Sequence, residues 1–86
     1  MPNAIMPSST NSALCSSLNF VVGGYYRHLP KNVVFRVTGI SNTKDWVIES
    51  ANSSYEYVQP TKGYIYEKIT EGEYEDAKLL WLLTDG

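Results

Sequence analysis

The sequence is poor in the residues that form covalent and metal cross-links. It contains one cysteine, Cys15, and one histidine, His28, among 86 residues. A single cysteine cannot form an internal disulfide, which suits a reducing compartment. A zinc site of the usual composition draws its ligands mainly from several Cys and His side chains, so such a site is excluded. We therefore expect a fold that holds together through its hydrophobic core, with no metal and no cofactor.

Long hydrophobic stretches and an early positive charge are also missing. The longest apolar runs span about five residues, whereas a membrane helix needs roughly twenty. No Lys or Arg precedes Arg27, so the chain lacks the positive start of a secretory signal. These absences predict a soluble, cytoplasmic protein that does not bind membranes.

Acidic residues are absent from the first 44 positions. That part carries four basic residues, whereas the remainder carries nine acidic residues against three lysines, so the two parts have charges of +4 and −6. The asymmetry is compatible with a basic patch beside an acidic one, but the two parts of a compact domain interleave and neutralise each other. The net charge of −2 disfavours, without excluding, a phosphate-binding surface.

A chain of this length has room for one domain. Residues 1–17 are uncharged and rich in Ser, Asn and Pro, which predicts a flexible N-terminal arm before a single domain over 18–86. Residues 18–24 predict a first strand, and residues 33–50 predict a hairpin whose Val33, Phe35 and Val37 face the core. Two further strands are predicted over 55–59 and 64–69, because Pro60 ends one and Gly63 allows entry to the next.

The last segment carries conflicting signals. Thr70 with Glu73 matches a capping box and Ile69 with Tyr74 matches a hydrophobic staple, which favour a helix over 71–83. The apolar run over 79–83, however, would be exposed on some side of a helix in so small a protein. We favour a loop or helical turn over 71–78 and a buried closing strand over 79–83. The whole pattern then predicts a small, strongly bent all-β antiparallel barrel of five to six strands.

Three short motifs of this chain are similar to those of a known family: GYYRH at 24–28, VTGIS at 37–41 and YVQP at 57–60. Residues 24–67 resemble a small bacterial and phage-associated family with the pattern G-x-Y-R-H, V-x-G-I-A and W-V-R-P, and no established activity. The resemblance implies an SH3-like β-barrel. The matching residues are Gly24, Tyr26, Arg27, His28, Val37, Gly39, Ile40, Val58 and Pro60. The chain departs from the pattern at Tyr57, Gln59 and Ser41, where the family has Trp, Arg and Ala, so a ligand contact by that Arg would be weakened here.

Tyrosines alternate on both sides of the Pro60 break, at positions 55, 57, 64 and 66. If the aliphatic side chains of Ile65 and Ile69 are buried in the core, the side chains of Tyr64 and Tyr66 on the opposite face are at least half exposed. Exposed aromatic patches indicate interaction surfaces. We therefore predict a non-enzymatic protein-binding module that uses a tyrosine-rich face. Its predicted binding residues are Tyr26, Arg27, His28, Tyr57, Tyr64 and Tyr66, and a methyl-lysine cage of Tyr57, Tyr64 and Tyr66 is a sharper variant.

Other functions stay open at this point. A small barrel that binds single-stranded nucleic acid is the main alternative, with Tyr25, Tyr26, Arg27, Lys31, Arg36 and Lys44 as its aromatic and basic residues. A catalytic pair of Cys15 and His28 is disfavoured relative to a structural role in which Arg27 pairs with Glu49 or Glu67. The small acidic chain also suits a phage-encoded accessory or inhibitor protein that occupies a charged surface of a host machine.

Overall fold

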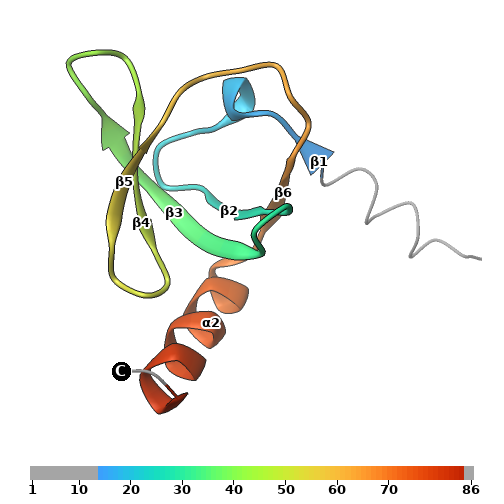
Figure 1. The fold of residues 1–86 in the computed structure, drawn as a ribbon, viewed down its shortest axis with the longest axis vertical. Helices are drawn as coiled ribbons and strands as arrows, with labels where there is room; N and C mark the ends of the chain where they lie inside the picture. The colour runs from blue at the N-terminus through green and yellow to red at the C-terminus, as the bar shows by residue number, and fades with distance from the viewer. Residues whose placement is uncertain (1–13, 85–86) are drawn as a thin grey trace, which may run out of the picture.

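The computed structural model describes residues 14–84, which form one antiparallel sheet and one long helix (Figure 1). In chain order the elements are β1 (Leu14–Cys15), the 3₁₀ turn η1 (Ser17–Asn19), β2 (Tyr25–His28), β3 (Val33–Ile40), β4 (Trp46–Ser50), β5 (Tyr55–Val58), β6 (Tyr66–Ile69) and α2 (Glu71–Thr84). The strands lie side by side in the order β1-β6-β2-β3-β4-β5. The hairpin predicted over 33–50 is confirmed as β3 and β4. Within the described residues, no helix has the length and apolarity needed to cross a membrane.

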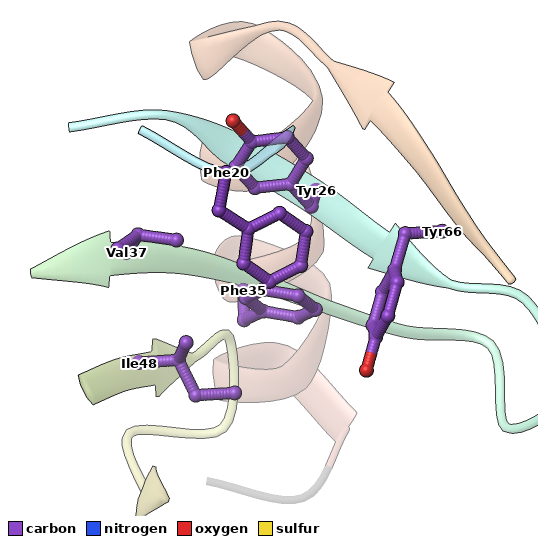
Figure 2. Packing of buried hydrophobic residues seen from close by; sticks show 6 residues of the cluster. All are labelled: Phe20, Tyr26, Phe35, Val37, Ile48 and Tyr66. Atoms are coloured by element: carbon purple, nitrogen blue, oxygen red, sulfur yellow. The ribbon is translucent and has the colours of Figure 1, made fainter. Parts of the chain in front are cut away.

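The inner face of the bent sheet carries an aromatic core (Figure 2). Its buried members are Phe20, Tyr26, Phe35, Val37, Ile48 and Tyr66. Phe20 reaches this core from the loop that follows η1, and its ring centroid lies 4.2 Å from that of Tyr26 and 4.9 Å from that of Tyr66. Because each buried ring removes about 150–250 Å² from water, these rings supply much of the apolar burial in so small a fold.

The first half of α2 packs against part of the outer face of the sheet. Side chains alternate along a strand, so Phe35 points to the inner core while Val34 points to the outer face. There Val34 packs with Ile69 and with Tyr74 of the helix, and all three are buried. Strand β3 is therefore buried on both faces at Val34 and Phe35, whereas Arg36 and Thr38 further along its outer face are exposed.

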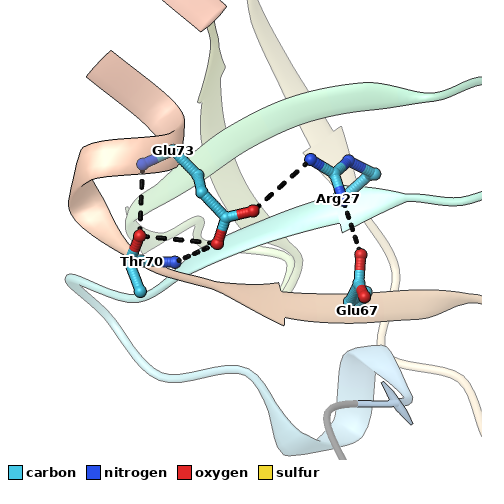
Figure 3. A network of polar contacts seen from close by, with 4 residues as sticks. All are labelled: Arg27, Glu67, Thr70 and Glu73. Carbon is cyan, nitrogen blue, oxygen red and sulfur yellow. Dashed lines mark hydrogen bonds and ion pairs between the residues drawn. The ribbon is translucent and has the colours of Figure 1, made fainter. Parts of the chain in front are cut away.

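Thr70 and Glu73 begin the helix (Figure 3). The Glu73 N–H donates to Thr70 Oγ1 at 3.2 Å, and the Thr70 N–H donates to Glu73 Oε1 at 3.2 Å. This is a reciprocal capping box, and Ile69 and Tyr74 on either side of it share one buried cluster. The helix signals are thus confirmed. The prediction of a closing strand over 79–83 is wrong, and with it the prediction of an all-β chain.

The sheet is open, because within residues 14–84 no ladder joins its two edge strands, β1 and β5. Instead, hydrogen bonds of the fully buried Ser17 connect the segment after β1 with the segment after β5. Its Oγ donates to the Gln59 carbonyl at 2.8 Å and accepts from the Thr61 N–H at 2.7 Å. The Trp46 indole N–H donates to the Ser17 carbonyl at 2.7 Å. A small, mostly β antiparallel fold is confirmed, but it is a bent open sheet rather than a closed barrel.

The N-terminal part of the fold differs from the prediction. Residues 14–17 were expected in the flexible arm, but β1 pairs with β6 and Ser16 and Ser17 are buried. Residues 1–13 of that predicted arm lie outside the described residues. The strand predicted over 18–24 is wrong, since these residues continue η1 and then form an irregular loop. At Gly24 this loop passes so close to the Tyr26 ring that a Cβ atom would lie 2.7 Å from its hydroxyl, which explains the glycine.

The environments of Ile65 and Tyr66 are the reverse of those predicted. Ile65 is 40% exposed and lies before β6, whereas Tyr66 is 7% exposed and belongs to the aromatic core. Ile69 is buried as predicted, but beneath α2 on the outer face. Each face of β6 therefore carries one buried residue, Tyr66 or Ile69, beside a more accessible one, Lys68 or Glu67. The alternation of its side chains thus does not identify a solvent-facing side.

Candidate functional site

The six residues predicted to bind a partner do not form one surface. Tyr26 and Tyr66 belong to the core, whereas Tyr57 and Tyr64 are 70% and 66% exposed. Tyr57 lies on β5 opposite Val47, and Tyr64 lies in the loop before β6. Since Tyr66 is buried, the predicted cage of three tyrosines is not assembled.

The other two predicted residues, Arg27 and His28, are engaged within the fold. Arg27 Nη1 donates to Glu67 Oε1 at 2.6 Å, and its Nη2 lies 3.7 Å from Glu73 Oε2 (Figure 3). The predicted pairing of Arg27 with a carboxylate is confirmed for Glu67. The His28 ring is half-buried and packs against Tyr66, with the ring centroids 5.2 Å apart. Both residues therefore have structural contacts that explain their presence.

The residues of the nucleic-acid alternative are mostly occupied as well. Arg36 Nη2 lies 3.0 Å from Glu49 Oε1, and the Tyr25 ring packs 5.3 Å from that of Tyr74. Tyr26 is buried, and Arg27 is paired as described above. A single-strand groove needs several exposed cations beside exposed rings. The geometry therefore supports this alternative less than the sequence does.

Cys15 and His28 are too far apart to act as a catalytic pair. Both pair with Tyr66, but from opposite sides of β6, so two strand spacings, about 9–10 Å, separate them. Burial raises the pKa of the Cys15 thiol and outweighs the opposing effect of Lys68, whereas an activated thiolate needs a lowered pKa. Among residues 14–84, no group of three His, Cys, Asp or Glu side chains is arranged to hold a metal ion.

A cluster of exposed apolar side chains lies on α2, which the sequence prediction missed. We call Leu79, Leu80, Leu82 and Leu83 the leucine face, and they are 56%, 63%, 56% and 76% exposed. Tyr74, Ala77 and Trp81 of the same helix are buried or half-buried. At 100° per residue, Leu83 points about 180° away from Tyr74. Figure 1 shows that the second half of α2 extends beyond the strands, which explains why nothing in the described chain covers these leucines.

Acidic side chains precede the leucine face along the helix. Glu75 and Asp76 lie one turn before Leu79, are exposed, and make no ion pair within the described residues. Over residues 71–84, four acidic residues stand against one lysine, which gives the helix a charge of −3. The exposed side of α2 thus changes from acidic to apolar along its length. The capping box at Thr70 and Glu73 was the sequence signal that could have revealed this surface.

A pocket of about 150 Å³ opens on the inner face of the sheet, which we call the inner pocket. Its apolar wall consists of Val33, Phe35, Ile48 and Val58. Its polar lining consists of His28, Lys31, Ser50, Glu56 and Tyr66. A second, more open groove runs between α2 and β2–β3, beside Arg27, Val34 and Trp81. The inner pocket is the more enclosed of the two and lies on the side of the sheet away from α2.

No protein-family model matches this chain, and neither a curated protein nor a solved structure matches it. The family resemblance over residues 24–67 therefore stays a prediction.

Proposed function

We propose that this chain is a non-enzymatic protein-binding module whose contact surface is the leucine face of α2. The observation that carries the proposal is the exposure of Leu79 and Leu83, at 56% and 76%, on the side of the helix away from the sheet. Isolated apolar side chains on a surface are ordinary, but a contiguous apolar patch is typical of an interaction site. Four leucines within five residues form such a patch.

The partner that fits this surface is a protein with an apolar groove and basic residues at one end of it. A helix that places side chains one turn apart into a groove is a common form of recognition. Leu79 and Leu83 have that spacing. The acidic turn with Glu75 and Asp76 lies immediately before them, so cations at the matching end of the groove would complement it.

The tyrosine-rich face contributes less to this proposal than the sequence suggests. Tyr57 and Tyr64 are exposed enough to touch a partner, but Tyr66 is not. We keep Tyr57 as a secondary contact candidate, because it lies on the edge strand β5 beside the exposed Tyr55. Such a contact would add to the helix interaction rather than replace it.

Three finer expectations remain part of the proposal. An SH3-like relationship is compatible with the strongly bent six-stranded sheet, although that sheet is open. A cytoplasmic location fits a chain with one cysteine. A phage-encoded accessory or inhibitor protein could act by inserting α2 into a groove of a host machine, and the acidic first half of the helix would then face basic residues of that machine.

Site-specific crosslinking tests the proposed surface. A photoreactive phenylalanine analogue at position 83 should crosslink a discrete protein in extracts of the native host, and the crosslinked peptide should lie in an apolar groove with nearby Lys or Arg. The same probe at Asn42, in the exposed turn between β3 and β4, should not crosslink that protein. The double substitution Leu79→Ser, Leu83→Ser should abolish its capture.

Matched variants separate loss of binding from general loss of apolar surface. Val21 and Val22 are 53% and 56% exposed but lie in the loop before β2, so Val21→Ser, Val22→Ser should keep full capture. Equal loss in both double variants would contradict the proposal. A dimer in solution that dissociates on Leu79→Ser, Leu83→Ser would also contradict it, because the leucine face would then bind a second copy of this chain.

A further inference from the structure

Tyr66 differs from the other buried tyrosines in what its hydroxyl contacts. Tyr26 Oη accepts a hydrogen bond from the Val21 N–H at 3.0 Å, and Tyr74 Oη donates to the Glu49 carbonyl at 3.2 Å. Within residues 14–84, Tyr66 Oη has no hydrogen-bond partner, although the residue is only 7% exposed. Tyrosines in protein cores normally have such a partner. The lack of a partner for the buried Tyr66 hydroxyl therefore requires a structural explanation.

The inner pocket supplies that reason. Tyr66 lines it together with the apolar side chains of Phe35 and Ile48. Figure 2 shows the Tyr66 hydroxyl at the far end of its ring, pointing away from Tyr26. The hydroxyl can therefore reach a bound molecule without any change in the core.

We propose that the inner pocket binds a small uncharged molecule, an aromatic ring that carries one acceptor for a hydrogen bond from Tyr66 Oη. The size follows from the pocket volume of about 150 Å³, since an apolar cavity of about this volume holds one benzene ring. The ring would lie against Phe35 and Ile48, and the acceptor would face Tyr66.

The charges around the pocket favour an uncharged ligand. Lys31 and Glu56 both line the pocket, and their formal charges cancel. Neither a carboxylate nor an ammonium group would therefore meet a net opposite charge there. Burial also raises the pKa of the Tyr66 hydroxyl, so it stays protonated and able to donate at neutral pH.

Benzamide is a suitable probe, because it combines one ring with a carbonyl acceptor. Titrated into the ¹⁵N-labelled full chain, it should cause saturable amide shifts concentrated at Val33, Ile48 and Val58. Tyr66→Phe removes the donor and leaves the ring, so benzamide should bind about tenfold more weakly, the effect of one hydrogen bond of about 1.4 kcal/mol. Toluene, which lacks the acceptor, should bind the natural chain and Tyr66→Phe equally well.

Two further variants keep the test independent of folding and of the leucine face. Val33→Phe places a larger side chain at a half-buried position of the pocket lining and should abolish benzamide binding, while Leu79→Ser, Leu83→Ser should leave it unchanged. Absence of saturable shifts with benzamide would overturn the proposal. Equal benzamide affinity of the natural chain and Tyr66→Phe would overturn it as well, and neither result would bear on protein binding by α2.

Discussion

The hydroxyl of Tyr74 donates a hydrogen bond to the main-chain carbonyl oxygen of Glu49 at 3.2 Å, and thereby ties α2 to strand β4. The Tyr74 ring is buried on the outer face of the sheet with Val34 and Ile69. One residue of the helix therefore provides both apolar contact and a polar anchor to the sheet. Among residues 14–84, the second half of the helix makes no hydrogen bond to a strand, and the leucine face is exposed.

Tyr74→Phe and Tyr66→Phe should have different effects on stability. Removing the Tyr74 hydroxyl leaves the Glu49 carbonyl without this donor, so the free energy of unfolding should fall by about 1 kcal/mol. Tyr66→Phe removes a hydroxyl with no partner in the described residues, so its effect should stay within about 0.5 kcal/mol. Urea unfolding of both full-length variants measures the difference. A larger loss for Tyr66→Phe would show that its hydroxyl has a partner in the folded chain.

Local signals predicted the helix start better than the global pattern did. The capping box and the staple depend only on neighbouring residues, and the structure contains both. The apolar run over 79–83 predicts a buried strand only if a protein this small covers its leucines. That assumption fails here, because α2 extends past the sheet. Gly72 in the first turn of α2 costs only about 1 kcal/mol relative to Ala, which the capping box and the buried Tyr74 offset.

The position of Tyr66 could not be predicted from alternation alone. Alternation predicts exposed tyrosines only if one face of β6 packs against the core and the other faces solvent. In the structure Tyr66 faces the aromatic core and Ile69 faces α2, so a buried residue lies on each face of the strand. Ile69 is buried by the helix α2, whereas the sequence analysis predicts a loop and a strand for this segment. One misassigned segment therefore led to the wrong tyrosine surface. In contrast, the pairing of Arg27 with a carboxylate is confirmed, and of the two predicted partners, Glu49 and Glu67, the structure shows Glu67 on the neighbouring strand.

Thr70→Ala should weaken the start of α2. The Thr70 hydroxyl accepts from the Glu73 N–H, and loss of such a cap costs about 1 kcal/mol. The midpoint of thermal unfolding should fall, together with the helical circular dichroism signal. Thr84→Ala is the matched control, because the Thr84 hydroxyl donates to the Leu80 carbonyl at the exposed end of the same helix and should contribute little. Equal losses in the two variants would contradict a specific role for the cap.

Ser17→Ala should be more damaging than its small change in volume suggests. The Ser17 hydroxyl donates to the Gln59 carbonyl and accepts from the Thr61 N–H, and the residue is fully buried. The substitution leaves both partners without this bond, at a cost of about 1–3 kcal/mol. Thr43→Ala, in an exposed turn, should change stability by less than about 0.5 kcal/mol in the same urea experiment. A Ser17→Ala effect as small as that would show that this bridge between the edge segments is not needed.

The stability of the fold should decline in alkali. Burial raises the pKa of Tyr26, Tyr66 and Tyr74 above the ordinary value of 10.0, and at Tyr74 the Glu49 carboxylate adds to this effect. Above about pH 10 the unfolded chain loses phenol protons that the folded chain keeps, so the free energy of unfolding falls as pH rises. Burial also raises the pKa of the Cys15 thiol, whose ordinary value is 9.0. This thiol therefore also lowers the free energy of unfolding as pH rises, starting at a slightly lower pH than the tyrosines.

Urea unfolding at several pH values between 7 and 11 measures this decline. These groups contribute their full stabilisation below about pH 9, and the urea midpoint should decrease continuously from pH 9 to pH 11. In Tyr74→Phe one of the three phenols is gone, so the decrease should be smaller than in the natural chain. A midpoint that stays constant or rises over this range would mean that the buried tyrosines titrate as they do in the unfolded chain, and the burial of Tyr26, Tyr66 and Tyr74 described above would then have to be rejected.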